Sequence, residues 1–133
     1  MTPGTGWRVL GAALCVVVAA IHIIDQGGII GSKEPGYVAI GYWVLEVVAL
    51  LIAVPTVLTR SRWTWFVASG VAAGPFVGFV LSRGPGLPDY TYDKGNWFAP
   101  LGVISLVVEA VLFGLASVAF YRDTRRRTRH LRA

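Results

Sequence analysis

The sequence predicts an all-α fold, a bundle of four transmembrane helices that forms a single membrane domain over residues 1–133. One reason is composition: the mean hydropathy is +0.63 and 14% of the residues are charged. A soluble domain of this length could not bury so much apolar surface in one core. The other is that four apolar segments reach about 20 residues, which is the length a helix needs to cross a bilayer.

The expected spans cover residues 7–25, 37–58, 63–81 and 98–121. Turn-forming or charged residues separate them: glycine and proline pairs after the first, RSR after the second and GPGLP after the third. Aromatic residues stand at the ends of the spans, where an amphipathic ring is stable among the headgroups. These residues are Trp7, Tyr37, Trp63, Trp97 and Tyr121.

The distribution of positive charge predicts the orientation, because loops rich in lysine and arginine resist translocation. Of the 12 such residues, nine fall at the end of the predicted bundle where the chain begins and ends, and three fall in the two longer loops. The three are Lys33, Arg83 and Lys94. We therefore expect both termini in the cytoplasm, the longer loops outside, and a multi-pass protein of the plasma membrane.

A basic cytoplasmic tail is predicted for residues 122–133. The formal net charge is +5, and six arginines crowd into this segment instead of spreading over a groove. They are Arg122, Arg125, Arg126, Arg127, Arg129 and Arg132. A basic segment directly after an apolar helix is attracted to anionic headgroups. The expected partner of the tail is therefore the lipid bilayer, not nucleic acid.

The third span carries the most specific packing signal. Gly70, Gly74 and Gly78 recur every four residues and share one helix face. Helices in lipid associate where small residues allow their backbones to approach. The pattern predicts close contact with a neighbouring helix, either within this chain, in a homo-oligomer or in a partner membrane protein.

Three ionisable residues lie inside the predicted spans: His22, Glu46 and Glu109. An ionisable group inside the hydrocarbon costs about 2.5–3.5 kcal/mol on insertion scales, so each requires a reason. The helical rise places both glutamates near the middle of the membrane and His22 closer to the outer face. Small or polar neighbours, including Tyr42 and Ser105, share their faces, so all three are expected to line one interior.

This predicted interior has several interpretations. The glutamates could be neutral and hydrogen-bonded to neighbouring helices as structural contacts. They could instead bind a cation or a proton-coupled substrate. His22 and Asp25 could also contribute to a metal or haem site, although the sequence assigns neither a metal nor a cofactor.

The loop at residues 82–97 is expected to be either an ordered connection or a lid over an outward cavity. Its charged and aromatic residues, among them Arg83 and Trp97, would then lie at the cavity mouth. The full set of candidate ligand-binding residues is His22, Asp25, Tyr42, Glu46, Arg83, Trp97, Ser105 and Glu109.

The stretch at residues 81–113, with LSRGPGLP followed by NWFAPLGVISLVVEAVLF, resembles a pattern of small uncharacterised four-helix integral membrane proteins of actinobacteria. The matching positions are Ser82, Arg83, Gly86, Leu87, Pro88, Trp97, Pro100, Leu101, Gly102, Ser105, Leu106 and Glu109. The resemblance implies a four-helix fold and a shared interior, and no established activity. The chain has HIIDQ at residues 22–26, where the pattern has a more acidic stretch with a second histidine.

Three functions follow as hypotheses. The protein is a binding module, with a transport-related role, that takes a small ligand or cation into its interior. Alternatively, it is a structural or accessory subunit that docks a partner through the glycine face. A third alternative is an intramembrane enzyme that uses a carboxyl acid on a lipid-soluble substrate, with catalytic residues unassigned. Small multidrug exporters carry a carboxylate early in their first helix, whereas the first acidic residue here is Asp25.

Overall fold

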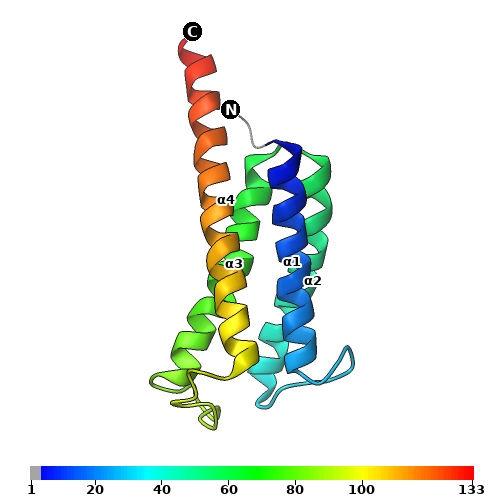
Figure 1. Cartoon of the computed structure of the whole chain (residues 1–133), viewed down its shortest axis with the longest axis vertical. Coiled ribbons are helices and arrows are strands. Elements are labelled where there is room, and N and C mark those ends of the chain that lie inside the picture. Colours follow the sequence, from blue (N-terminus) through cyan, green and yellow to red (C-terminus); the bar gives the residue numbers. More distant parts are fainter. Residues whose placement is uncertain (1–3) are drawn as a thin grey trace.

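The computed structural model describes residues 4–133, which form four helices and no β-strand. The helices are α1 (Thr5–Asp25), α2 (Gly36–Leu58), α3 (Arg62–Arg83) and α4 (Pro100–Arg132), as Figure 1 shows. All four are long and apolar enough to cross a membrane. The predicted all-α architecture with four candidate spans is therefore confirmed.

The bundle has two distinct ends (Figure 1). At the terminal end, α1 begins, α4 finishes, and residues 59–61 join α2 to α3. At the loop end, residues 26–35 join α1 to α2, and residues 84–99 join α3 to α4. The even number of antiparallel helices thus puts the start of α1 and the finish of α4 on the same side.

Helix α4 is longer than the expected span at residues 98–121. Its 33 residues include the predicted basic tail, which continues the helix to Arg132. The physical reason is local: no glycine or proline follows Tyr121, and arginine is a good helix former, so nothing ends the helix there.

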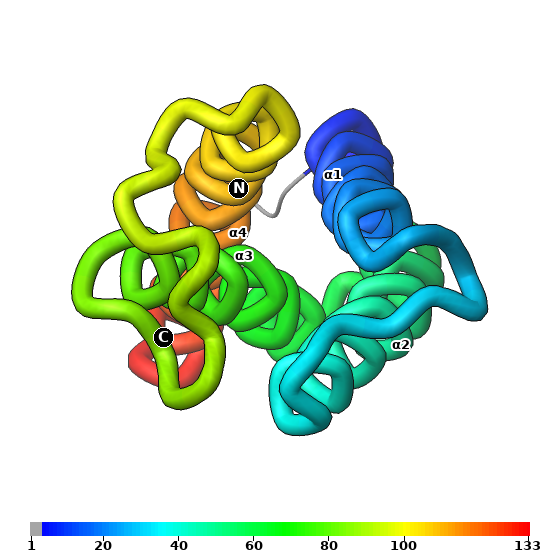
Figure 2. The backbone as a smooth tube through the Cα atoms, turned by 90° about the horizontal axis from the view of Figure 1, so that it is seen from below, coloured from blue at the N-terminus to red at the C-terminus, as the bar shows by residue number. Residues whose placement is uncertain are grey.

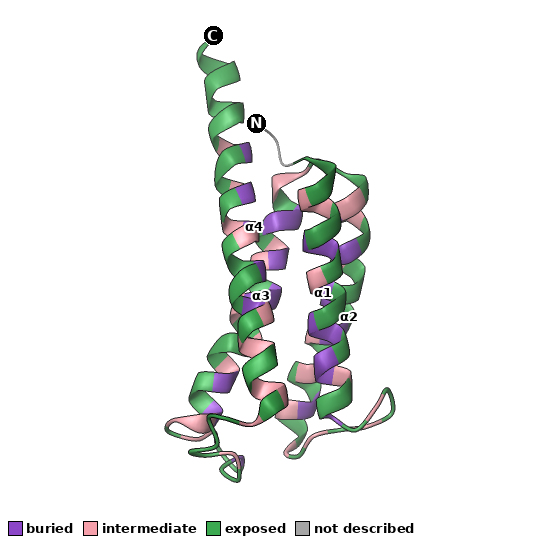
Figure 3. Ribbon diagram, viewed as in Figure 1, coloured by how far each residue is buried: buried purple, intermediate pink, exposed green. Residues whose placement is uncertain are grey.

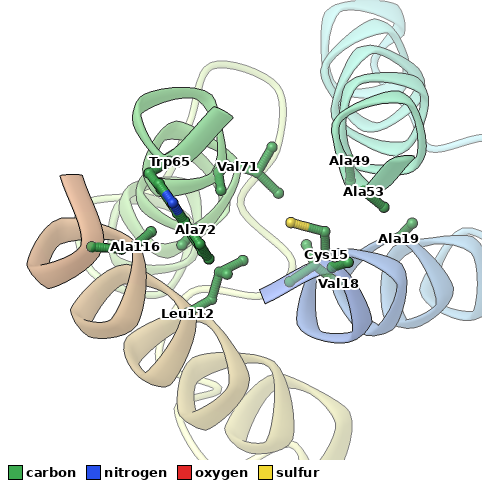
Figure 4. Close-up of a cluster of buried hydrophobic side chains, with 13 residues drawn as sticks. Cys15, Val18, Ala19, Ala49, Ala53, Trp65, Val71, Ala72, Leu112 and Ala116 are labelled. Carbon is green, nitrogen blue, oxygen red and sulfur yellow. The ribbon is translucent and has the colours of Figure 1, made fainter. Parts of the chain in front are cut away.

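The helices pack as two pairs, α1 with α2 and α3 with α4, and no close backbone contact joins α2 to α4. Small side chains fill the core between the pairs, so the backbones can approach closely. Figures 3 and 4 show these buried residues on the inward helix faces. The core includes Ala12, Cys15, Val18, Ala19, Ala49, Ala53, Trp65, Ala68, Val71, Ala72, Leu112, Ala116 and Ala119.

This core belongs to the half of the bundle nearest the terminal end. Its members come from the middle of α1, the second half of α2, the first half of α3 and the middle of α4. Trp65 is its largest side chain, and its ring packs directly against the backbone at Gly11. The bundle is therefore closed and well packed at the terminal end.

The glycine face of α3 does not make the contact that the sequence predicts within this chain. A Cβ atom placed at Gly70, Gly74 or Gly78 would meet no heavy atom within 4 Å. On the same helix, the alanines at 68 and 72 are fully buried in the core instead. The close approach involves different glycines: Gly11 lies against Trp65, and Gly102 lies against Phe79.

The contact at Gly11 predicts a position that cannot accept a side chain. A Cβ there would lie 2.6 Å from Cζ3 of Trp65, whereas Gly6, in the same helix, has open space. We expect Gly11→Val to lower the free energy of unfolding by about 1–3 kcal/mol, the usual cost of overpacking a core. The matched Gly6→Val variant is expected to keep the parent stability. Thermal unfolding in detergent measures both, and equal stability of the two variants would contradict the packing described.

Candidate functional site

A cavity of about 940 Å³ lies between the two helix pairs and extends from the loop end along α3 as far as Phe66. All four helices and both loops contribute to its wall, and Figure 2 shows their arrangement from the loop end. This volume is near the upper limit of the range for small-molecule sites. The cavity therefore borders the small-residue core, and Val71 belongs to both.

Glu109 is the most buried polar side chain of the cavity wall, with 2% of its surface exposed. Ser105, one helical turn earlier, donates a hydrogen bond of 2.5 Å to its Oε1 atom. Within residues 4–133, no group donates a hydrogen bond to its Oε2 atom, which is buried. A buried polar atom without a partner is costly, so this oxygen is suited to receive a donor from a ligand.

Glu46 is also buried, but it does not line the cavity. Gln26 donates a hydrogen bond of 3.3 Å from its Nε2 to Oε2 of Glu46, which links α1 to α2. The predicted interior shared by both glutamates is therefore wrong for Glu46. Its neighbours Leu45 and Val48 face the cavity instead, because the rotation of α2 turns Glu46 toward α1.

The mouth of the cavity carries an ion pair on its α1–α2 side. Lys33 Nζ lies 3.1 Å from Asp25 Oδ2, and the Tyr42 hydroxyl donates a hydrogen bond of 2.5 Å to the same oxygen. The ring of His22 packs edge-on against Tyr42, with 5.1 Å between the ring centroids. All four side chains line the cavity.

His22 is oriented by its own helix. Its Nδ1 atom lies 2.8 Å from the carbonyl oxygen of Val18. Since a carbonyl oxygen only accepts, we assign the proton to Nδ1, which leaves Nε2 as an acceptor. His22 therefore contributes a ring of fixed orientation to the cavity wall.

A second ion pair lies on the α3–α4 side of the mouth. Arg83 lies 3.4 Å from Asp93, and its guanidinium is 4.5 Å from the centroid of the Phe79 ring. Tyr90 donates a hydrogen bond of 3.1 Å to Asp93, and burial raises the pKa of the Tyr90 hydroxyl above its ordinary value. Trp97 stays outside the cavity wall and packs edge-on against Phe79, with centroids 6.0 Å apart.

One hydrogen bond joins the two sides of the mouth. The Tyr37 hydroxyl, at the start of α2, donates to the carbonyl oxygen of Pro88 in the long loop at 2.5 Å. The side chain of Tyr37 thus attaches the long loop to the opposite helix pair. It lies at the mouth, where Leu87, Tyr90 and Tyr92 belong to the cavity wall.

The structure brings six of the eight candidate residues to one cavity: His22, Asp25, Tyr42, Arg83, Ser105 and Glu109. Tyr90 and Asp93, which belong to the charged and aromatic residues expected at the mouth, also line the wall, whereas sequence reasoning missed Lys33, Tyr37 and Asn96. The opposite charges of Asp25 and Lys33, eight positions apart across a tight turn, were an available signal. The opposite charges within residues 82–97 also indicated local ion pairs, and the path of the long loop decides that Arg83 pairs with Asp93.

Within residues 4–133, no three histidine, cysteine, aspartate or glutamate side chains group closely enough to hold a metal ion. His22 and Asp25 share the cavity wall with Glu109, but the nearest partners of Asp25 are Lys33 and Tyr42. The chemistry that this arrangement offers is therefore hydrogen bonding, charge pairing and aromatic contact.

Comparisons of this chain with protein-family models, with curated proteins and with solved structures find no match. Several positions of the sequence pattern described above, Ser82, Arg83, Ser105 and Glu109 among them, do line the cavity. A functional assignment consequently depends on the geometry of the cavity.

The hydrogen bond across the mouth leads to a testable consequence. We expect Tyr37→Phe to free the long loop, since it removes one hydrogen bond worth about 1 kcal/mol, and to speed amide exchange at residues 85–95 roughly five-fold. Hydrogen exchange with mass spectrometry measures this rate. Tyr121→Phe, at the other end of the bundle, is the control, and unchanged exchange in Tyr37→Phe would show that the bond does not hold the loop.

Proposed function

We propose that this protein binds a small amphiphilic organic cation within the membrane, in the cavity between its helix pairs. The observation that carries the proposal is the carboxyl group of Glu109, which is buried in the cavity wall and has one oxygen without a protein donor. An ammonium group supplies both the missing hydrogen bond and the opposite charge. Ser105 fixes the other oxygen and so aims the carboxyl.

Aromatic rings in the cavity wall support a cationic ligand. Phe66, Phe79 and Phe113 line the wall together with Tyr42. The faces of such rings attract a cation, and the attraction is stronger where water is excluded. The positive side chains of the cavity mouth, Lys33 and Arg83, are each paired with an aspartate. Their charges are therefore partly neutralised and repel a cationic ligand less.

The open side of the cavity supports a ligand that also has an apolar part. Val44 on α2 and Phe66 on α3 line the cavity and are 57% and 56% exposed, so the wall between these helices is accessible from the lipid side. The glycine face of α3 adds room along this side, because a Cβ at Gly74 would meet nothing. An alkyl chain fits there without displacing a side chain.

The charge distribution supports an outward-facing mouth. Arg8, Arg60, Arg62 and the arginines of α4 lie at the terminal end, and this clustering supports the proposal that the terminal end is cytoplasmic and that the protein belongs to the plasma membrane. The cavity then opens to the outer side and the outer leaflet. A transport-related role would begin with capture of the cation from that side.

The two buried glutamates provide a matched test. We expect Glu109→Gln to weaken binding of octylammonium about ten- to a hundred-fold, the value of a charge-assisted hydrogen bond. Glu46→Gln is expected to leave the affinity unchanged, because Glu46 faces Gln26 and not the cavity. Equilibrium dialysis of labelled octylammonium against the protein in nanodiscs, corrected with empty nanodiscs, measures both.

Octanol is the neutral control for the same experiment. It has the same chain without the charge, so the parent protein should prefer octylammonium and Glu109→Gln should lose that preference. Equal affinity of the parent for both compounds, or an equal effect of the two glutamine substitutions, would exclude Glu109 as the counter-ion.

The glycine face yields a second test. Gly74→Leu places a side chain in the cavity and is expected to weaken octylammonium binding about five-fold or more through loss of space. Gly114→Leu is the control, since Gly114 also has free space around it but lies outside the cavity wall. Dialysis gives the affinities, and thermal unfolding verifies that both variants are folded. Parent affinity in Gly74→Leu would contradict the proposed position of the alkyl chain.

A second candidate function is that of an accessory subunit. The observation that favours it is the same open face at Gly70, Gly74 and Gly78, which leaves room for the backbone of a helix from another chain. Under this function, a partner membrane protein co-purifies with the parent, Gly74→Leu releases it, and octylammonium binding is absent.

A further inference from the structure

The basic part of α4 forms a second hollow, separate from the cavity. The helix has 33 residues, or about 50 Å at 1.5 Å per residue, and the hydrocarbon core is about 30 Å thick. Its last turns therefore stand beyond the other three helices (Figure 1). Because these turns are helical, the positions of their arginines are defined relative to one another.

Four of the six arginines share one face of the helix. Arg122, Arg125, Arg126 and Arg129 are spaced i, i+3, i+4 and i+7, and together they line a hollow of about 530 Å³. Arg127 is on a different face and pairs with Asp123 at 3.6 Å. The positive charge of the segment is thus concentrated on one side.

The floor of this hollow is apolar. Ser117, Val118 and Tyr121 form its lower part, within the five residues before Arg122, and Val118 and Tyr121 are exposed. Val118 lies inside the predicted fourth span, and Tyr121 lies at its end, at headgroup level. The hollow therefore extends from the hydrocarbon region into the headgroup region.

Aromatic rings hold two of the arginines at the boundary between these regions. The guanidinium of Arg125 lies 5.2 Å from the centroid of the Tyr121 ring, and that of Arg122 lies 5.2 Å from the ring of Trp7 on α1. Contact with a ring face leaves the guanidinium N–H groups free to donate at its edge. Both groups are thereby positioned at headgroup depth, where tyrosine and tryptophan rings are stable.

We infer that this hollow is a binding site for an anionic glycerophospholipid. Its phosphate accepts hydrogen bonds from the arginines, and an acyl chain lies along Val118 and Tyr121. Arginine matches phosphate oxygens in a bidentate geometry. The apolar floor favours a lipid over a nucleic acid, since a nucleic acid would not contact residues inside the hydrocarbon.

The test uses the full chain in nanodiscs that contain equal amounts of phosphatidylglycerol and phosphatidylcholine. Native mass spectrometry of protein released from the discs measures the ratio of the two lipids retained. We expect the parent to retain phosphatidylglycerol in preference, and Arg125→Gln/Arg126→Gln to reduce that preference about thirty-fold, which corresponds to roughly 1 kcal/mol for each of the two basic residues.

The control is Arg127→Gln/Arg132→Gln, which removes the same charge outside the hollow and should keep the parent preference. If both double variants lost the preference for phosphatidylglycerol equally, the lipid would be attracted by net charge alone, and the proposed binding site would be wrong. An unchanged preference in Arg125→Gln/Arg126→Gln would overturn it as well. So would binding of single-stranded RNA that depends on Arg125 and Arg126 while lipid retention does not.

Discussion

The structure depends on close contact between small side chains in the half of the bundle nearest the terminal end. Lipid provides no hydrophobic force that drives helices together, so association relies on packing and on hydrogen bonds between helices. Cys15, Ala19, Ala49, Ala72 and the residues around them allow this close contact, and they are fully buried. Trp65 fills the remaining space beside Gly11. This packing holds the two helix pairs together without any contact between α2 and α4.

The same packing explains why a cavity forms at the loop end. Toward that end, the facing positions of α2 and α3 are valines, glycines and aromatic residues that do not fill the space between the pairs. Polar groups then gather where the helices are apart: Glu109 and Ser105 deep in the wall, and the ion pairs of Lys33 and Arg83 at the mouth. The bundle is therefore closed at one end and open at the other. A ligand would reach the cavity from the open end.

The two lipid-facing features of the protein lie at opposite ends of this framework. The cavity has a half-partnered carboxyl group and would select a cation, whereas the hollow on α4 presents arginines and would select an anion. Each has exposed apolar residues in its wall, Val44 and Phe66 in the cavity and Val118 in the hollow. The two proposals are therefore independent, because substitutions in the arginine face leave the wall of the cavity intact.

The helices and the inward position of one buried carboxyl group could be predicted from the sequence, because both depend on composition and helical periodicity. Hydropathy and span length predicted the four helices to within a few residues, except that nothing in residues 122–132 stops α4. The inward position of Glu109 was also predictable, since a carboxyl group facing acyl chains is too costly.

What the sequence by itself determined is therefore the number, length and type of the helices, together with the polar residues that had to avoid lipid. Only the tertiary structure decided which inward face meets which. The rotation of α2 turns Glu46 to Gln26, the path of the long loop brings the Tyr37 hydroxyl to the Pro88 carbonyl, and the separation of the helix pairs leaves Gly74 uncovered. The physical reason is that helical periodicity specifies the face of a residue within its own helix, while the neighbour of that face depends on the packing of every other helix.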